Sequence, residues 1–70
     1  MKEQRERIKH LLSRNHLSQV WLINILADKG IEVDKTVMSA VLNGSRKGPK
    51  AIDIISQSLE VLDKFESIKL

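Results

Sequence analysis

The sequence predicts an all-α protein, and three observations support that prediction. Apolar residues recur three and four positions apart along most of the chain, as they do on one face of an α-helix. A single proline and three glycines leave room for long helices. Aromatic residues make up only 3% of the chain, which argues against a β-rich core. We therefore expect a small four-helix bundle that forms one domain over residues 1–70.

The composition excludes several classes of protein. The chain has no cysteine, so it has neither a disulfide framework nor a thiolate metal site. We see no signal peptide and no long apolar run, and we expect an intracellular, soluble protein without a membrane partner. We find no nucleophile–base pair, no paired carboxylates and no glycine-rich phosphate loop, so we do not expect an enzyme. His10 and His16 lack the spacing of a metal site, and no metal or other cofactor is expected.

The first predicted helix covers residues 1–14 and is amphipathic. Ile8, Leu11 and Leu12 form one apolar stripe, and charged residues fill most of the remaining surface. Asn15 is the expected stop, because asparagine tolerates the left-handed conformation that often ends a helix.

The central segment, residues 18–44, is predicted to form two helices joined by a corner that contains Gly30. Ser18 and Asp34 are the expected N-caps, because their side-chain oxygens can accept a hydrogen bond from a free backbone N–H. Gly30 falls where the first of the two helices ends, since glycine enters the left-handed region without steric cost. The residues expected to bury one face of each helix are Leu22, Ile25 and Leu26 in the first, and Met38, Val41 and Leu42 in the second.

The last predicted helix begins at Gly48-Pro49 and runs over about residues 49–66. Proline suits the first helical position, because its missing N–H has no partner there. Two apolar stripes follow, and we expect one to enter the core and the other to be a surplus protein-binding face. The alternative is that the first two helices cover both stripes. The expected core stripe is Ile52, Ile55, Leu59 and Leu62, and the expected surplus stripe is Ala51, Ile54, Val61 and Phe65.

An ordered set of short motifs runs through residues 17–50. The motifs are Ser18-Gln19, Leu22-Ile23, Leu26, Val33-Asp34 and Val41-Leu42-Asn43-Gly44. Together they resemble the helix-turn-helix of the phage Cro and repressor class, which implies a λ-repressor-like fold. The chain departs from that class in a longer turn over residues 27–32. It also carries Val37 and Ala40 where polar or basic base-reading residues often lie.

The resemblance implies a transcriptional regulator that binds operator DNA and controls a lysogenic–lytic genetic switch in the cytoplasm of a bacterial host. In that class the second helix of the motif enters the major groove. A glutamine at the start of the first helix touches a phosphate, and a basic loop after the second helix lies near the backbone. The partner is double-stranded DNA, and no small-molecule ligand is expected. The residues assigned to DNA are Gln19, Lys35, Thr36, Ser39, Asn43, Arg46, Lys47 and Lys50.

The class also includes modulators of repression, which look like Cro but bind and inactivate a repressor. The alternative function is therefore an antirepressor that uses the same helix-turn-helix face on a cognate repressor. The apolar residues on that face and the surplus stripe of the last helix favour this alternative, and the stripe also allows a homodimer. The residues assigned to a protein partner are Val20, Val37, Ala40, Ile54, Val61 and Phe65.

The charge of the chain is unevenly distributed. Residues 1–50 hold ten Lys and Arg against five Asp and Glu, whereas residues 51–70 hold two against four. The basic part contains the helix-turn-helix, which favours a polyanionic partner.

Overall fold

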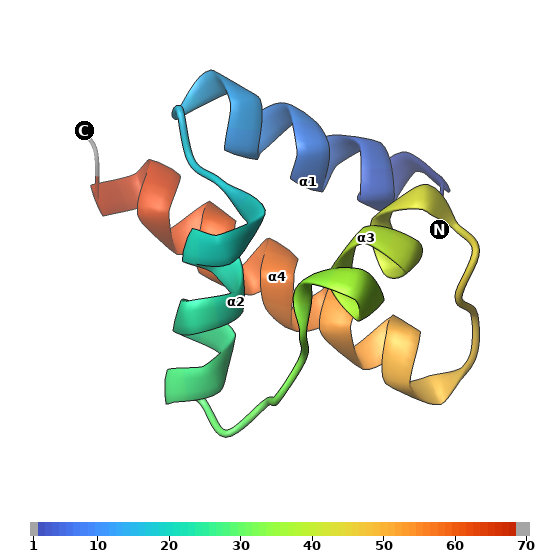
Figure 1. The fold of residues 1–70 in the computed structure, drawn as a ribbon. Coiled ribbons are helices and arrows are strands. Elements are labelled where there is room, and N and C mark those ends of the chain that lie inside the picture. Colours follow the sequence, from blue (N-terminus) through green and yellow to red (C-terminus); the bar gives the residue numbers. More distant parts are fainter. Residues whose placement is uncertain (1, 69–70) are drawn as a thin grey trace.

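Four helices make up the fold in the computed structural model, which describes residues 2–68. They are α1 (Lys2–Arg14), α2 (Gln19–Asp28), α3 (Lys35–Asn43) and α4 (Pro49–Ile68), and the described part of the chain contains no strand. In Figure 1, α1 and α4 are the long helices; the shorter α3 packs against both, and α2 packs against α3 and α4. α3 and α4 each contact all three other helices. The all-α prediction is therefore confirmed.

The core is formed by one face of each helix. The stripes predicted for the first three helices are buried, apart from Ile25, which is half-buried. Trp21 lies at the edge of this core, where its ring meets that of Phe65 edge-on with centroids 5.5 Å apart. Phe65 is consequently half-buried against α2 and is not a free docking residue.

α4 buries residues from both of its predicted stripes. Ile54 and Val61, which we assigned to a protein-binding face, are 1% and 7% exposed. Ile52, which we assigned to the core, is 52% exposed. The prediction of a surplus stripe is therefore wrong, because α1, α2 and α3 all pack against α4 and bury Ala51, Ile54 and Val61 of that stripe.

The cap at the end of α1 also differs from the prediction. The left-handed residue is His16, with φ of 56°, and not Asn15. The His16 N–H donates to the Ser13 carbonyl at 3.1 Å, and the Leu17 N–H donates to the Leu12 carbonyl at 2.8 Å. These two bonds satisfy carbonyls that the end of a helix leaves without partners.

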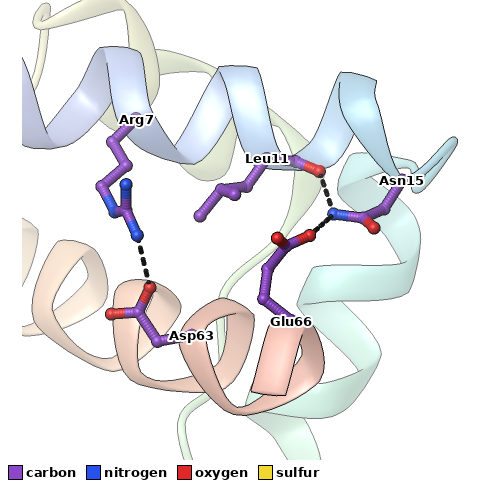
Figure 2. A network of polar contacts seen from close by, with 5 residues as sticks. All are labelled: Arg7, Leu11, Asn15, Asp63 and Glu66. Carbon is purple, nitrogen blue, oxygen red and sulfur yellow. Dashed lines mark hydrogen bonds and ion pairs between the residues drawn. The ribbon is translucent and has the colours of Figure 1, made fainter. Parts of the chain in front are cut away.

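Two polar contacts join α1 to the second half of α4 (Figure 2). Arg7 Nη2 pairs with Asp63 Oδ1 at 2.9 Å, and both side chains are more than half exposed. Asn15 Nδ2 donates to the Leu11 carbonyl at 2.8 Å and to Glu66 Oε2 at 2.6 Å. The Asn15 side chain therefore links the end of α1 to α4, in place of the backbone role that we expected.

Candidate macromolecular interface

Both helices of the α2–α3 pair begin at the N-caps that the sequence predicted. Ser18 Oγ accepts a hydrogen bond from the Trp21 N–H at 3.0 Å, and Asp34 Oδ1 accepts one from the Val37 N–H at 2.7 Å. Gly30 has φ of 85°, so it follows the end of α2 in the left-handed conformation that favours glycine. Both helices therefore begin and end where their local sequence directs.

The connection between α2 and α3 covers residues 29–34, and it is anchored rather than loose. The Ile31 N–H donates to the Leu26 carbonyl at 2.9 Å. The side chains of Ile31 and Val33 are half-buried and pack on the core. These two apolar residues explain how a longer turn than that of the resembled class still holds α3 against α2.

A hydrogen bond between two candidate residues defines the centre of the interface. Ser39 Oγ donates to Gln19 Oε1 at 2.9 Å, and both side chains are half-buried. The bond places the first turn of α2 against the middle of α3, while Lys35 and Thr36 lie exposed in the first turn of α3. We assigned Gln19 and Ser39 to separate DNA contacts, and the structure brings them together. We call this surface the α2–α3 face, and its residues are Gln19, Lys35, Thr36, Ser39 and Asn43.

The apolar residues assigned to this region are only partly available. Val37 and Ala40 are half-buried, and Val37 packs against the core. Val20, directly after Gln19, is 49% exposed, as predicted. Any apolar contact made here by a partner is consequently small and centred on α2.

Two shallow hollows lie between the connection that joins α2 to α3 and the start of α4, and Lys50 lines both. The first, of about 370 Å³, is also lined by Glu32 and Asp34 together with Val33 and Val37. The second, of about 450 Å³, is also lined by Glu32 and Asp53 together with Ala27, Gly30 and Ile31. We call the three carboxylates Glu32, Asp34 and Asp53 the acidic rim. Because Lys50 stands among them, its charge is partly offset at the place where we expected it to meet a phosphate.

The charge of the segment that forms α2 and α3 is opposite to our expectation for a DNA-binding motif. Residues 18–44 contain two basic side chains, Lys29 and Lys35, against three acidic ones, Asp28, Glu32 and Asp34, for a net charge of −1. The excess positive charge of residues 1–50 lies in α1, in the loop after α3 and at Lys50 in the first turn of α4. The negative charge of this segment is visible in the sequence when the charges of residues 18–44 are summed separately from those of the rest of residues 1–50.

The remaining basic candidates lie beyond the other end of α3. Arg46 and Lys47 are exposed in the loop that follows Gly44, the left-handed C-cap residue of α3 with φ of 81°. The Ser45 N–H and the Arg46 N–H both donate to the Ala40 carbonyl, at 2.9 and 3.2 Å. These bonds fix the start of the loop, so that its two cations are separated from Lys50 by the turn at Gly48-Pro49.

No protein-family model, curated protein or solved structure matches this chain. Within residues 2–68, no helix is long and apolar enough to cross a membrane. The same residues contain no cluster of three or more His, Cys, Asp or Glu side chains that could hold a metal ion.

Proposed function

We propose that this chain is an antirepressor, which binds the DNA-binding domain of a cognate repressor and keeps that repressor from its operator. The proposal joins the resemblance to the Cro and repressor class with one observation. The first turn of α3, which would read bases in a DNA-binding protein, directly follows Glu32 and the N-cap Asp34, and Glu32 shares a hollow with a third carboxylate, Asp53.

The charge of the acidic rim suits a protein partner better than it suits DNA. A repressor presents a basic surface to its operator, because it must neutralise phosphates. Glu32 and Asp53 are exposed and have no ion-pair partner among the described residues, so they are available to such a surface. Phosphates approaching the same place would meet like charge, at a cost that low salt makes larger.

Operator DNA is the second candidate partner, and a different observation favours it. The Gln19–Ser39 hydrogen bond leaves the amide nitrogen of Gln19 as a donor at the start of α2, next to the exposed Lys35 and Thr36. In this alternative Gln19 holds a phosphate, and the two α3 residues reach base edges from the first turn.

A charge reversal at Glu32 distinguishes the two functions, because it moves the two affinities in opposite directions. The experiment titrates the labelled chain with a candidate repressor domain and, separately, with duplex DNA, and follows both by chemical shift. If the antirepressor proposal holds, Glu32→Lys weakens binding to the repressor domain by about tenfold. If DNA is the partner, the same change strengthens duplex binding.

Glu3→Lys is the matched control, because Glu3 is an exposed glutamate in the first turn of α1. It makes the same change in net charge away from the acidic rim, and it should leave both affinities within about twofold. The antirepressor proposal fails if the unaltered chain binds duplex DNA and no repressor domain of this class. It also fails if the two charge reversals weaken repressor binding equally.

A further inference from the structure

A hollow with the opposite charge lies at the C-terminal end of α3. It has a volume of about 310 Å³, and it forms where the first half of α1, the loop after α3 and the start of α4 meet. Figure 1 shows this meeting point beside the N-terminus, where the loop after α3 turns into α4. We call it the basic hollow, and its lining residues are Arg5, Arg46, Lys47, Gly48, Ile52 and Ile55.

The three cations of the basic hollow form no ion pair within residues 2–68. The ion pairs of that part of the chain involve other basic residues. Glu6, the acid next to Arg5 in sequence, is paired with Lys9 at 2.8 Å, and that contact lowers the pKa of Glu6. Arg5, Arg46 and Lys47 are therefore available to an acidic group from another molecule.

Arg5 is held at the hollow by its approach to Gly44. A Cβ atom placed on Gly44 would lie 2.9 Å from Arg5 Nη2, so the guanidinium lies directly against the backbone that ends α3. The C-terminal end of a helix carries partial negative charge, which favours a cation there. Arg5 is half-buried at this position.

Two isoleucines give the basic hollow an apolar part. Ile55 is 2% exposed and lies at its base, whereas Ile52 is 52% exposed. The phosphates of a nucleic acid gain no free energy from contact with this apolar surface, whereas an aliphatic side chain would bury it favourably. The combination of cations with an exposed isoleucine is therefore suited to a peptide that is both acidic and apolar.

We propose that the basic hollow binds an acidic segment of a partner protein, in which an aliphatic residue lies between carboxylates. The aliphatic residue packs on Ile52, and the carboxylates pair with Arg5, Arg46 and Lys47. This site is separate from the acidic rim and does not depend on the antirepressor proposal.

The acidic half of α4 in a second copy of the chain is a poorer occupant, because its carboxylates are already engaged. Glu60 pairs with Lys29 and Lys64, Asp63 pairs with Arg7, and Glu66 accepts a hydrogen bond from Asn15. Binding a second copy would require several of these contacts to break.

The test uses a short synthetic peptide with one leucine flanked on both sides by aspartates, added to the full labelled chain. We expect chemical-shift changes at Arg5, at residues 44–48 and at Ile52. The Arg46→Gln/Lys47→Gln double variant should bind about five- to tenfold more weakly, because both cations of the loop are lost. The Arg14→Gln/Lys64→Gln variant is the matched control, since it removes one Arg and one Lys elsewhere, and it should bind within about twofold of the unaltered chain.

The apolar part is tested by a double-mutant cycle. Ile52→Ser should weaken binding of the peptide about threefold. A peptide with serine in place of leucine should also bind the unaltered chain about threefold more weakly. The two changes together should weaken it little further, because each removes the same contact. Ile52 is already half-exposed, so its replacement leaves the core intact.

Four results would overturn the proposal. Equal weakening by the two double variants would indicate attraction to net charge alone. Equal binding of a peptide with lysine for aspartate would exclude charge recognition. A duplex oligonucleotide that shifts the same residues at lower concentration would make this a phosphate site. Shifts at these residues and at the acidic rim that grow with protein concentration, without peptide, would indicate a self-association site.

Discussion

The α1–α4 side of the molecule and the two ends of α3 use their charged residues differently. On the α1–α4 side several charges pair with one another, as Arg7 does with Asp63 and Glu60 does with Lys64. At the ends of α3, the acidic rim and the cations of the basic hollow form no ion pair with a described residue. Charges that are paired within the chain attract a partner only weakly, whereas unpaired charges of one sign favour a partner of the opposite sign.

The comparison also shows why the net charge of the chain is a poor guide to its partner. The total of +3 suggests a polyanion. Glu32 and Asp34 of the acidic rim precede α3, whereas Arg46 and Lys47 of the basic hollow follow it. Salt screens charges from one another beyond about 10 Å, so the charges near each end of α3 act mainly on a partner at that end. A partner that contacts one end experiences the local charge and not the sum.

The largest expected effect is on the free energy of unfolding and concerns α4, the helix that contributes residues to both regions. Ile54→Ala should lower the free energy of unfolding by about 2–4 kcal/mol, since it leaves a cavity at a side chain that is 1% exposed. Ile52→Ala, on the same helix but at a side chain that is 52% exposed, should lower it by less than about 1 kcal/mol. Urea unfolding of the two variants measures both values. Equal losses would contradict the buried face that the structure gives to α4.

The next effect is a gain in stability at Ser58. Its Oγ is fully buried in the middle of the buried face of α4 and has no hydrogen-bond partner among residues 2–68. Ser58→Ala removes this unpaired hydroxyl and should raise the free energy of unfolding by about 1–2 kcal/mol. Ser56→Ala is the control, because Ser56 is exposed on the same helix and its replacement gains only helix propensity, about 0.5 kcal/mol. A loss of stability in Ser58→Ala would show that the hydroxyl has a partner.

Much of the fold was predictable because the signals that define it are local. Ser18, Asp34 and Gly30 act within a few residues of their own positions, and the apolar stripes of the first three helices follow from spacing alone. The choice of His16 over Asn15 at the end of α1 was not predictable, because cap signals leave a helix end uncertain by a residue or two.

The candidate site was less predictable, because it depends on contacts between distant residues. The Gln19–Ser39 hydrogen bond joins two helices, and the basic hollow needs Arg5 to meet a loop some forty positions further on. Which side of α4 is buried depends on how many neighbours surround it, and the alternating stripes of its sequence are compatible with more than one answer. Periodicity therefore identified the helices, but the surface chemistry emerged only from their packing.

A smaller effect separates the two roles of Asp34, which caps α3 and belongs to the acidic rim. Asp34→Ala should cost about 1 kcal/mol of stability, because the Val37 N–H loses its acceptor. Asp34→Asn should retain the cap and stay within about 0.5 kcal/mol of the unaltered chain, while it removes the charge. If the antirepressor proposal holds, the Asn variant binds a repressor domain several-fold more weakly, as titration of the folded protein would show. Unchanged binding would remove Asp34 from the interface.

The smallest expected effect is on the α1–α4 side, where Asp63→Asn makes the same chemical change as Asp34→Asn. Asp63 is 55% exposed in its pair with Arg7, so solvent already screens the attraction and the loss of stability should stay below about 0.5 kcal/mol. Binding to either the repressor domain or the acidic peptide should also stay within about twofold, because the freed Arg7 lies outside both surfaces. Thermal unfolding and the two titrations described above provide the measurements. If Asp63→Asn weakened partner binding as much as Asp34→Asn, then ion pairing within the chain would not distinguish the binding surface from the rest of the surface. The difference between the two regions would then have no bearing on where a partner binds.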